Sequence, residues 1–131
     1  MDRPVHRWST AVMTLAVDVF LRDADGQWNV LDVPEGCNDS AGFENWRETV
    51  WGSPAVRSLG ATYLPVLASS DLYVEASDVP EFLREVALLR AHLEAVAAAV
   101  GEAPDLVGSR LDNIESAALR AREIGGGVLI W

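Results

Sequence analysis

The chain has 131 residues, of which half are hydrophobic and 23% are charged, a balance that predicts one globular domain with a sizeable core and excludes a disordered chain. Twenty acidic residues face ten basic ones, so the formal net charge is −10. This excess of negative charge repels nucleic acid backbones and anionic membrane surfaces, and it suits either solubility or the capture of a basic partner.

Cysteine content and apolar runs indicate the compartment. Cys37 is the only cysteine, so no intramolecular disulfide can form, and a reducing cytoplasm is the natural environment. The N-terminus lacks the apolar run of a signal peptide, and no apolar stretch approaches the ~20 residues that span a membrane. All ten basic residues are arginine, which indicates a GC-rich bacterial genome. We therefore expect a cytoplasmic bacterial protein with neither a nucleic acid nor a membrane partner.

The first part of the chain predicts a short arm and a hairpin. Residues 1–10 are expected to form an N-terminal arm, and residues 11–131 a single domain. Strands are expected at 11–21 and 27–33, because apolar residues recur there with period two. Asp23-Ala24-Asp25-Gly26 is a turn signal between them, so the two strands should pair as a hairpin.

A short helix with two tryptophans is expected next. Residues 42–51 carry apolar side chains at helical spacing, and Ser40 could cap this helix. Trp46 and Trp51 are five residues apart, which corresponds to about 140° around the axis of an α-helix. One of the two indoles could therefore point outward, and the alternative is partial burial with the indole N–H at the rim.

The second half is expected to be mainly helical. Two short extended segments, 63–68 and 72–76, precede a long helix over 78–100, which has an acidic capping-box start and a glycine stop. Pro65 indicates that the first segment is an edge strand or no strand at all. A further helix is expected over 109–124, capped by its first serine, and the apolar residues 128–131 are expected to add a strand. The predicted fold class is α+β. A small mixed or antiparallel sheet, made of the N-terminal hairpin and the C-terminal strand, packs against two main helices and one short helix.

Catalytic and metal-binding signals are weak. His6 and His92 are the only histidines, and no spacing of histidine and cysteine supplies the three or four ligands of a zinc site. A nucleophilic thiol needs a nearby base, and no histidine lies near Cys37 in the sequence. We expect no metal and no cofactor, and an enzyme that uses Cys37, His92 and an acid is the third hypothesis.

Acidic and aromatic residues suggest a surface for a protein partner. Tryptophan is enriched at interface hot spots, and acidic surfaces attract basic partners. The predicted contact patch joins the short helix to the segment that precedes the long helix, and consists of Glu44, Trp46, Glu48, Trp51, Asp71, Tyr73 and Glu75.

A pocket for a small ligand is the alternative. Asp18 interrupts an apolar strand, and a buried carboxylate is costly unless it is paired. Together with Arg22 and Trp28, it could orient a ligand between the sheet and the helices, as in a ligand-binding or biosynthetic pathway-accessory protein. A solvent-exposed sheet face would also explain Asp18.

Three segments carry a resemblance to known proteins: the tryptophan-containing helix Phe43–Trp51, the Ser70-Asp71 segment that leads into the helix from Asp78, and the glycine-rich apolar end Gly125–Trp131. In these segments the chain resembles small bacterial proteins that are grouped with immunity proteins of polymorphic toxin systems. This resemblance implies a non-catalytic, stoichiometric binder that blocks a toxin. Together with the net charge, it predicts an antitoxin that sequesters a basic protein, for which a toxin encoded nearby is a candidate. A monomer or a homodimer is expected, since an exposed C-terminal strand edge could pair two copies.

Overall fold

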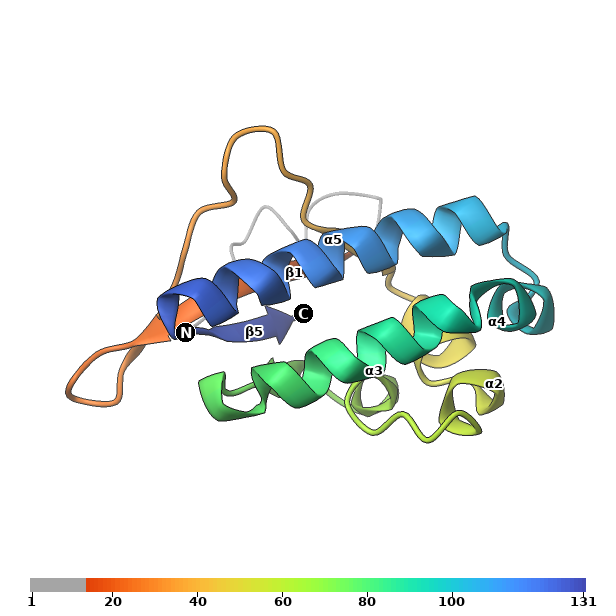
Figure 1. The fold of residues 1–131 in the computed structure, drawn as a ribbon, viewed down its shortest axis with the longest axis horizontal. Helices are drawn as coiled ribbons and strands as arrows, with labels where there is room; N and C mark the ends of the chain where they lie inside the picture. Colours follow the sequence, from red (N-terminus) through yellow and green to blue (C-terminus); the bar gives the residue numbers. More distant parts are fainter. Residues whose placement is uncertain (1–13) are drawn as a thin grey trace.

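The computed structural model describes residues 14–131 (Figure 1). The predicted arm 1–10, with His6 and Trp8, lies outside the described residues, as do residues 11–13 of the first predicted strand. The described chain forms a five-stranded antiparallel sheet with helices α3 and α5 packed along one face (Figure 1). The predicted α+β class is therefore confirmed, and the sheet is antiparallel rather than mixed.

The predicted N-terminal hairpin is confirmed. Strand β1 (Thr14–Arg22) pairs antiparallel with β2 (Trp28–Val30). In the turn, the Asp23 carboxylate accepts the backbone N–H of Asp25 at 2.9 Å, and Gly26 takes a φ of 82°, which favours glycine. Period two in the sequence and turn chemistry were thus sufficient to place this unit.

The C-terminal strand β5 (Gly127–Ile130) is confirmed, but its position differs from the expectation. It lies between β1 and β4 (Leu72–Val74), with Val128 opposite Val19 on one side and Val74 on the other. The expected exposed edge is therefore wrong, because β5 is hydrogen-bonded along both of its edges. All four of its residues are buried, and a wholly apolar strand loses the most water-exposed surface inside a sheet.

The region predicted as one short helix begins instead as a strand. Residues Ser40–Phe43 form β3, which pairs antiparallel with the start of β1, so Ser40 caps no helix. A Cβ on Gly42, whose φ is 108°, would collide with the Trp46 indole, so this backbone approach requires glycine. Only Arg47–Trp51 is helical, as a single π-helical turn named η1.

The segment 63–68, predicted to be extended, is instead the 3₁₀ helix η2 (Leu64–Ala68). The Glu85 carboxylate accepts the backbone N–H groups of Thr62, Tyr63 and Leu64, at 2.6, 2.9 and 2.7 Å. N–H groups at the start of a helix have no partner within the helix, and here a carboxylate supplies the acceptors. This acceptor comes from a distant part of the chain, so no local sequence pattern reveals it.

The predicted long helix 78–100 is two helices, α3 (Val79–Ala91) and α4 (Leu93–Val100). The ring Nδ1 of His92 lies 3.1 Å from the Leu88 carbonyl oxygen, the acceptor that the His92 backbone N–H would use in a continuous helix. That N–H donates instead to the Leu89 oxygen at 3.1 Å. The side chain thus competes with the backbone, and the helix breaks at this residue.

Helix α5 (Pro104–Ile124) begins before the predicted Ser109 cap. Proline suits the first position of a helix, because that position needs no N–H donor. The Ser109 hydroxyl donates to the Leu106 carbonyl at 2.9 Å and caps nothing. The predicted end is correct, since Gly125 takes a φ of 72°. None of the helices within residues 14–131 combines the length and the apolar character needed to cross a membrane.

Two short turns precede the long helices. Helix α2 (Pro54–Arg57) is capped by the Ser53 hydroxyl, which accepts the Val56 N–H at 3.3 Å. The 3₁₀ turn η3 (Ala76–Asp78) leads from β4 directly into α3. Asp78 therefore lies within a turn and makes no capping hydrogen bond through its side chain, contrary to the predicted capping box.

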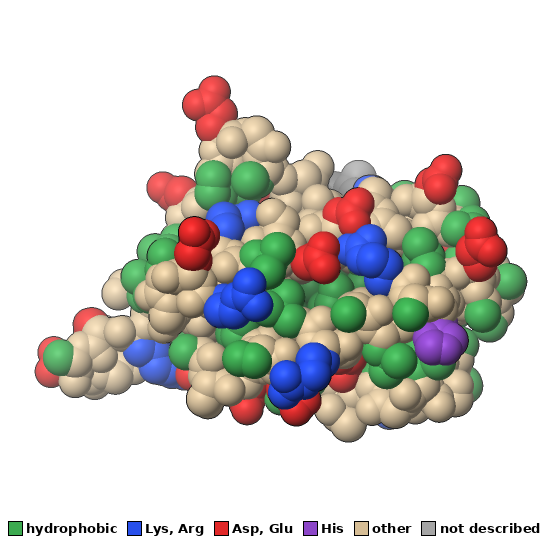
Figure 2. All heavy atoms as spheres, in the orientation of Figure 1, with side chains coloured by type: hydrophobic (Ala, Val, Ile, Leu, Met, Phe, Trp, Pro, Cys, Tyr) green, Lys and Arg blue, Asp and Glu red, His purple; other side chains and the backbone are tan. Residues whose placement is uncertain are grey.

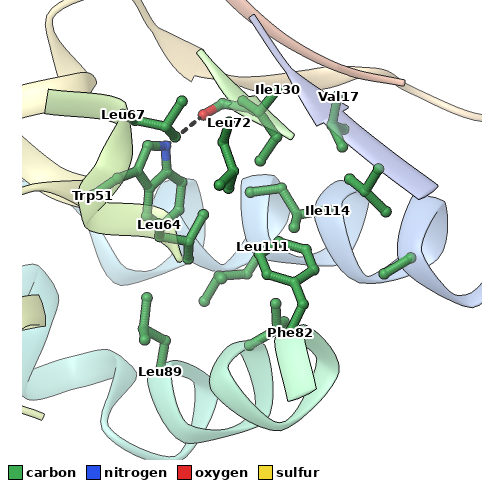
Figure 3. Close-up of a cluster of buried hydrophobic side chains, with 14 of the residues drawn as sticks. Val17, Trp51, Leu64, Leu67, Leu72, Phe82, Leu89, Leu111, Ile114 and Ile130 are labelled. Carbon is green, nitrogen blue, oxygen red and sulfur yellow. Dashed lines mark hydrogen bonds between the residues drawn. The ribbon is translucent and has the colours of Figure 1, made fainter. Parts of the chain in front are cut away.

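The main core lies between the sheet and helices α3 and α5 (Figure 3). The Trp51 indole N–H donates to the Ala41 carbonyl at 2.9 Å, so this large side chain is buried with its polar atom satisfied. Apolar side chains from four elements belong to the same core, including Leu72, Ile130, Phe82, Leu89, Leu111 and Ile114. The core therefore joins the middle of the chain to its C-terminus.

Candidate functional site

The structure buries both tryptophans of the predicted contact patch. Trp46 is 1% exposed and Trp51 is 0% exposed, and their rings meet edge to face at 5.7 Å between centroids. The expectation of an outward indole is wrong, because the segment is not an α-helix. In the π-helical turn the Gly52 N–H bonds back to the Arg47 oxygen, so residues five apart lie on nearly the same side.

Two acids of the predicted patch are paired with one arginine. Arg47 donates through Nε to Glu44 at 2.5 Å and through one terminal nitrogen to Asp71 at 2.7 Å. Its other terminal nitrogen donates to the Ser70 carbonyl at 2.9 Å. Partial burial works to lower the pKa of Arg47, but hydrogen bonds to Asp71 and Glu44 outweigh it and raise that pKa above its ordinary value. Arg47 therefore neutralises this part of the patch and ties η1 to the start of β4.

At the other end of the predicted patch, Glu75 pairs with Arg22. Two guanidinium nitrogens reach the two carboxylate oxygens at 2.9 and 2.8 Å, and these hydrogen bonds hold the pKa of Glu75 below its ordinary value. Tyr73 is exposed and meets Trp28 edge to face. Of the seven predicted patch residues, only Glu48 and Tyr73 are exposed and outside any ion pair among residues 14–131.

The three residues of the alternative pocket are not gathered at one site. Asp18 is 6% exposed, and its carboxylate accepts the Trp131 indole N–H at 2.8 Å, so it does not lie on an open sheet face. It does line a pocket beside α5, described below. Arg22 and Trp28 are not part of that lining. Trp28 packs instead against Phe20 on the sheet.

The candidate catalytic residues are also apart. Cys37 is exposed in the loop after β2, whereas His92 is exposed at the junction of α3 and α4, toward the other end of the molecule (Figure 1). Within the part of the chain that the structure describes, no three His, Cys, Asp or Glu side chains are placed to hold a metal ion. The fold therefore does not assemble the cysteine, histidine and acid of the third hypothesis.

A different acidic surface stands clear of the helical body. Residues 23–39, here called the acidic segment, contain no basic residue and five acidic ones: Asp23, Asp25, Asp32, Glu35 and Asp39. The segment comprises the hairpin turn and the loop that projects after β2 (Figure 1). None of the five carboxylates forms an ion pair with the described residues. Six acids elsewhere in that part of the chain do pair with arginine.

The projecting loop is held at both of its ends. The Leu31 N–H donates to the Val19 carbonyl and the Val17 N–H donates to the Asp39 carbonyl, both at 2.8 Å. Asn113 of α5 also donates to the Ser40 carbonyl at 2.9 Å. The chain between these points therefore arches away from β1, and it carries the acidic side chains seen at the tip of the projection in Figure 2.

A pocket of about 210 Å³, here called the α5 pocket, lies where this arch faces the C-terminal half of α5. Apolar side chains form much of its lining: Val19, Leu31, Val33, Pro34 and Ile124. The remaining lining residues are charged: Asp18, Asp32, Arg120 and Glu123. Figure 2 shows hydrophobic side chains directly below the acidic tip of the projection. The pocket thus combines apolar walls with charged groups.

Most of these site residues were missed in the sequence. A count of charges would have found the acidic segment, because its 17 residues contain five acids and no arginine. The α5 pocket had no such signal, because its walls come from β1, the loop and α5. A comparison of the chain with family models, with curated proteins and with solved structures gives no match.

Proposed function

We propose that this protein is a non-catalytic, acidic binding protein of the immunity type that sequesters a basic protein partner. The observation that carries the proposal is the acidic segment: its 17 residues contain five acids and no basic residue, and none of these carboxylates forms an ion pair with the described residues. The partner is a cationic protein, and a toxin encoded beside this gene fits that description. The contact surface lies on the acidic segment, because Trp46 and Trp51 are buried and Arg22 and Arg47 pair three acids of the originally predicted patch.

Electrostatics explains why such a segment suits capture. Like charges along one segment create a local negative potential that steers a cationic protein and raises its association rate. The hydrogen bonds at the two ends of the loop hold this charge in place before binding, which lowers the ordering cost of association. The interaction should therefore weaken as salt increases.

The experiment is co-expression with the product of the neighbouring gene, with association kinetics measured at low and high salt. A variant with Asp25→Asn, Asp32→Asn and Glu35→Gln is expected to associate about tenfold more slowly at low salt. A matched control removes the same charge elsewhere through Asp78→Asn, Asp105→Asn and Glu94→Gln, three exposed positions. The proposal is contradicted if the neighbour's product is not bound, or if both triple variants associate at the same rate.

The α5 pocket supports a second candidate function, that of a small-ligand-binding or pathway-accessory protein. Its apolar walls and few charged groups have the character of a ligand site. Its volume of about 210 Å³ is below the range of roughly 300–1,000 Å³ that is typical of ligand pockets. We therefore place protein binding first, and a thermal-shift screen of metabolites would test the second candidate.

A further inference from the structure

The α5 pocket and the acidic segment are parts of one continuous surface. Asp32 belongs to the acidic segment and also lines the pocket, and Pro34 of the lining directly precedes Glu35. A partner attracted to the acidic segment would therefore meet the pocket. With a volume of about 210 Å³, the pocket admits one large side chain rather than a folded segment.

We infer that the α5 pocket receives an arginine or lysine side chain of the basic partner. This inference rests on the proposed function and specifies how the partner is anchored. Both side chains have a long apolar stem and a cationic head, and they commonly lay the stem along apolar surface while the head remains near water or a counter-charge.

The walls of the pocket fit the stem. Leu31 and Val33 come from the loop, and Ile124 comes from the last turn of α5. Ile124 is 49% exposed, although it is a large aliphatic residue beside other apolar side chains. Covering these side chains with methylene groups stabilises the complex by about 25 cal/mol for each Å² of apolar surface removed from water.

The charges of the pocket fit the head group. The carboxylates of Asp32 and Glu123 form no hydrogen bond or ion pair with residues 14–131, so both are available to a cation. Asp18 is not counted, because its carboxylate is already bonded to Trp131. An acidic side chain in the pocket would be repelled by these carboxylates and by Glu35 nearby in the loop, and an uncharged side chain would form no ion pair with them.

Arg120 is the one cation in the lining. One of its terminal nitrogens donates to the Ser116 hydroxyl at 3.1 Å, one turn back toward the start of α5. Glu123 and Ile124 lie one turn in the opposite direction along the helix. Removing the charge of Arg120 should therefore favour a cationic occupant and disfavour an anionic one, which gives the inference a direct test.

The test uses small probes and NMR spectra of the whole protein. Nα-acetyl-arginine amide and Nα-acetyl-lysine amide are titrated while the backbone amide signals of Leu31, Val33 and Ile124 are followed. Nα-acetyl-norleucine amide supplies the stem without the charge, and Nα-acetyl-glutamate amide supplies an anion. Saturable shifts with the two cationic probes, weaker shifts with norleucine and none with glutamate are expected. Equal or stronger binding of norleucine or glutamate, or no shift with any probe, would overturn the inference.

Variants identify the groups involved. Asp32→Asn with Glu123→Gln is expected to weaken binding of the arginine probe about fivefold, whereas the matched pair Asp105→Asn with Glu94→Gln leaves it unchanged. Arg120→Gln is expected to tighten binding of the same probe. An unchanged affinity in the first pair, or weaker binding in Arg120→Gln, contradicts the inference.

The two proposals fail separately. In one outcome, the neighbouring gene product binds the Asp32→Asn, Glu123→Gln variant as tightly as it binds the unchanged protein, but binds the acidic-segment triple variant less tightly. The loss then comes from Asp25 and Glu35, so the pocket inference is wrong and the proposed function stands. If the probes bind the pocket as expected while the neighbouring product does not bind the protein, the proposed function fails and the cation site remains.

Discussion

Glu85 holds the start of the 3₁₀ helix η2 in place. Glu85 is 7% exposed, and its carboxylate accepts hydrogen bonds from the three successive backbone N–H groups of residues 62–64. A buried carboxylate without partners would be strongly destabilising, and buried N–H groups without acceptors would be as well. The carboxylate and the N–H groups therefore satisfy each other's hydrogen-bonding needs, and neither could be buried at this cost without the other.

Replacing this carboxylate should destabilise the whole domain. Glu85→Ala is expected to lower the free energy of unfolding by about 3 kcal/mol, because three backbone N–H groups lose a charged acceptor. Urea unfolding followed by circular dichroism measures the change. The control is Glu81→Ala on the same helix, where the exposed carboxylate pairs only with Arg84 and its loss should have little effect. Equal destabilisation by the two variants would contradict this account of η2.

At the scale of elements, Gly127 has no side chain and so lets β1 and β4 pack closely against β5. A Cβ on Gly127 would collide with the Phe20 ring and lie 2.5 Å from the Val74 carbonyl oxygen. Phe20 comes from β1 and Val74 from β4, so Gly127 allows both neighbouring strands to approach β5 closely.

Gly127→Ala is therefore expected to cost about 2 kcal/mol of unfolding free energy, because strands or the Phe20 ring must shift. Gly108→Ala is the matched control. There the new methyl group meets only the end of the Leu93 side chain, at 3.1 Å, and alanine favours the helix by about 1 kcal/mol. Thermal unfolding of the two variants compares them. A Gly127 variant as stable as the Gly108 variant would show that the sheet tolerates the added methyl group.

At the scale of the molecule, the last residues of the chain complete the sheet. Ile130 lies opposite Val17 in β1 and opposite Leu72 in β4, and it contributes to the core shown in Figure 3. The sheet can therefore form fully only after the C-terminus has returned to strands made much earlier in the chain. Such non-local pairing carries a large loop-closure cost before its contacts form.

Shortening a side chain in the C-terminal strand should accordingly lower the free energy of unfolding as much as shortening one at the centre of the core. Ile130→Ala is expected to lower the unfolding free energy by about 3 kcal/mol, through lost burial and a new cavity. Leu119→Ala, an exposed leucine on α5, should change it by less than about 1 kcal/mol. Urea unfolding measures both, and a small effect at Ile130 would contradict the central position of β5.

Local patterns predicted the elements that depend on local physics. The hairpin follows from period-two alternation and a glycine turn, and the helix ends at Gly101 and Gly125 follow from the left-handed conformation that glycine adopts. Strand β3 and helix η2 were missed, because distant partners stabilise them. The former pairs with β1, and the latter depends on the carboxylate of Glu85.

The candidate site divides in the same way. The number of carboxylates, and their concentration in residues 23–39 without a basic neighbour, can be counted in the sequence. The sequence does not reveal which carboxylates an arginine neutralises. Arg47 reaches Asp71, and Arg22 reaches Glu75, across long separations in the chain. Burial of both Trp46 and Trp51 likewise depends on a π-helical turn that no periodicity indicates.

The sequence by itself determined that this protein is acidic, that it has an α+β fold with an N-terminal hairpin, and that its apolar C-terminus forms a strand, because composition, periodicity and turn chemistry act over a few residues. Only the tertiary structure decided that β5 lies inside the sheet, which acids arginines neutralise, and where a pocket opens beside α5. Those outcomes depend on contacts between residues far apart in the chain, and such contacts exist only after the backbone has folded.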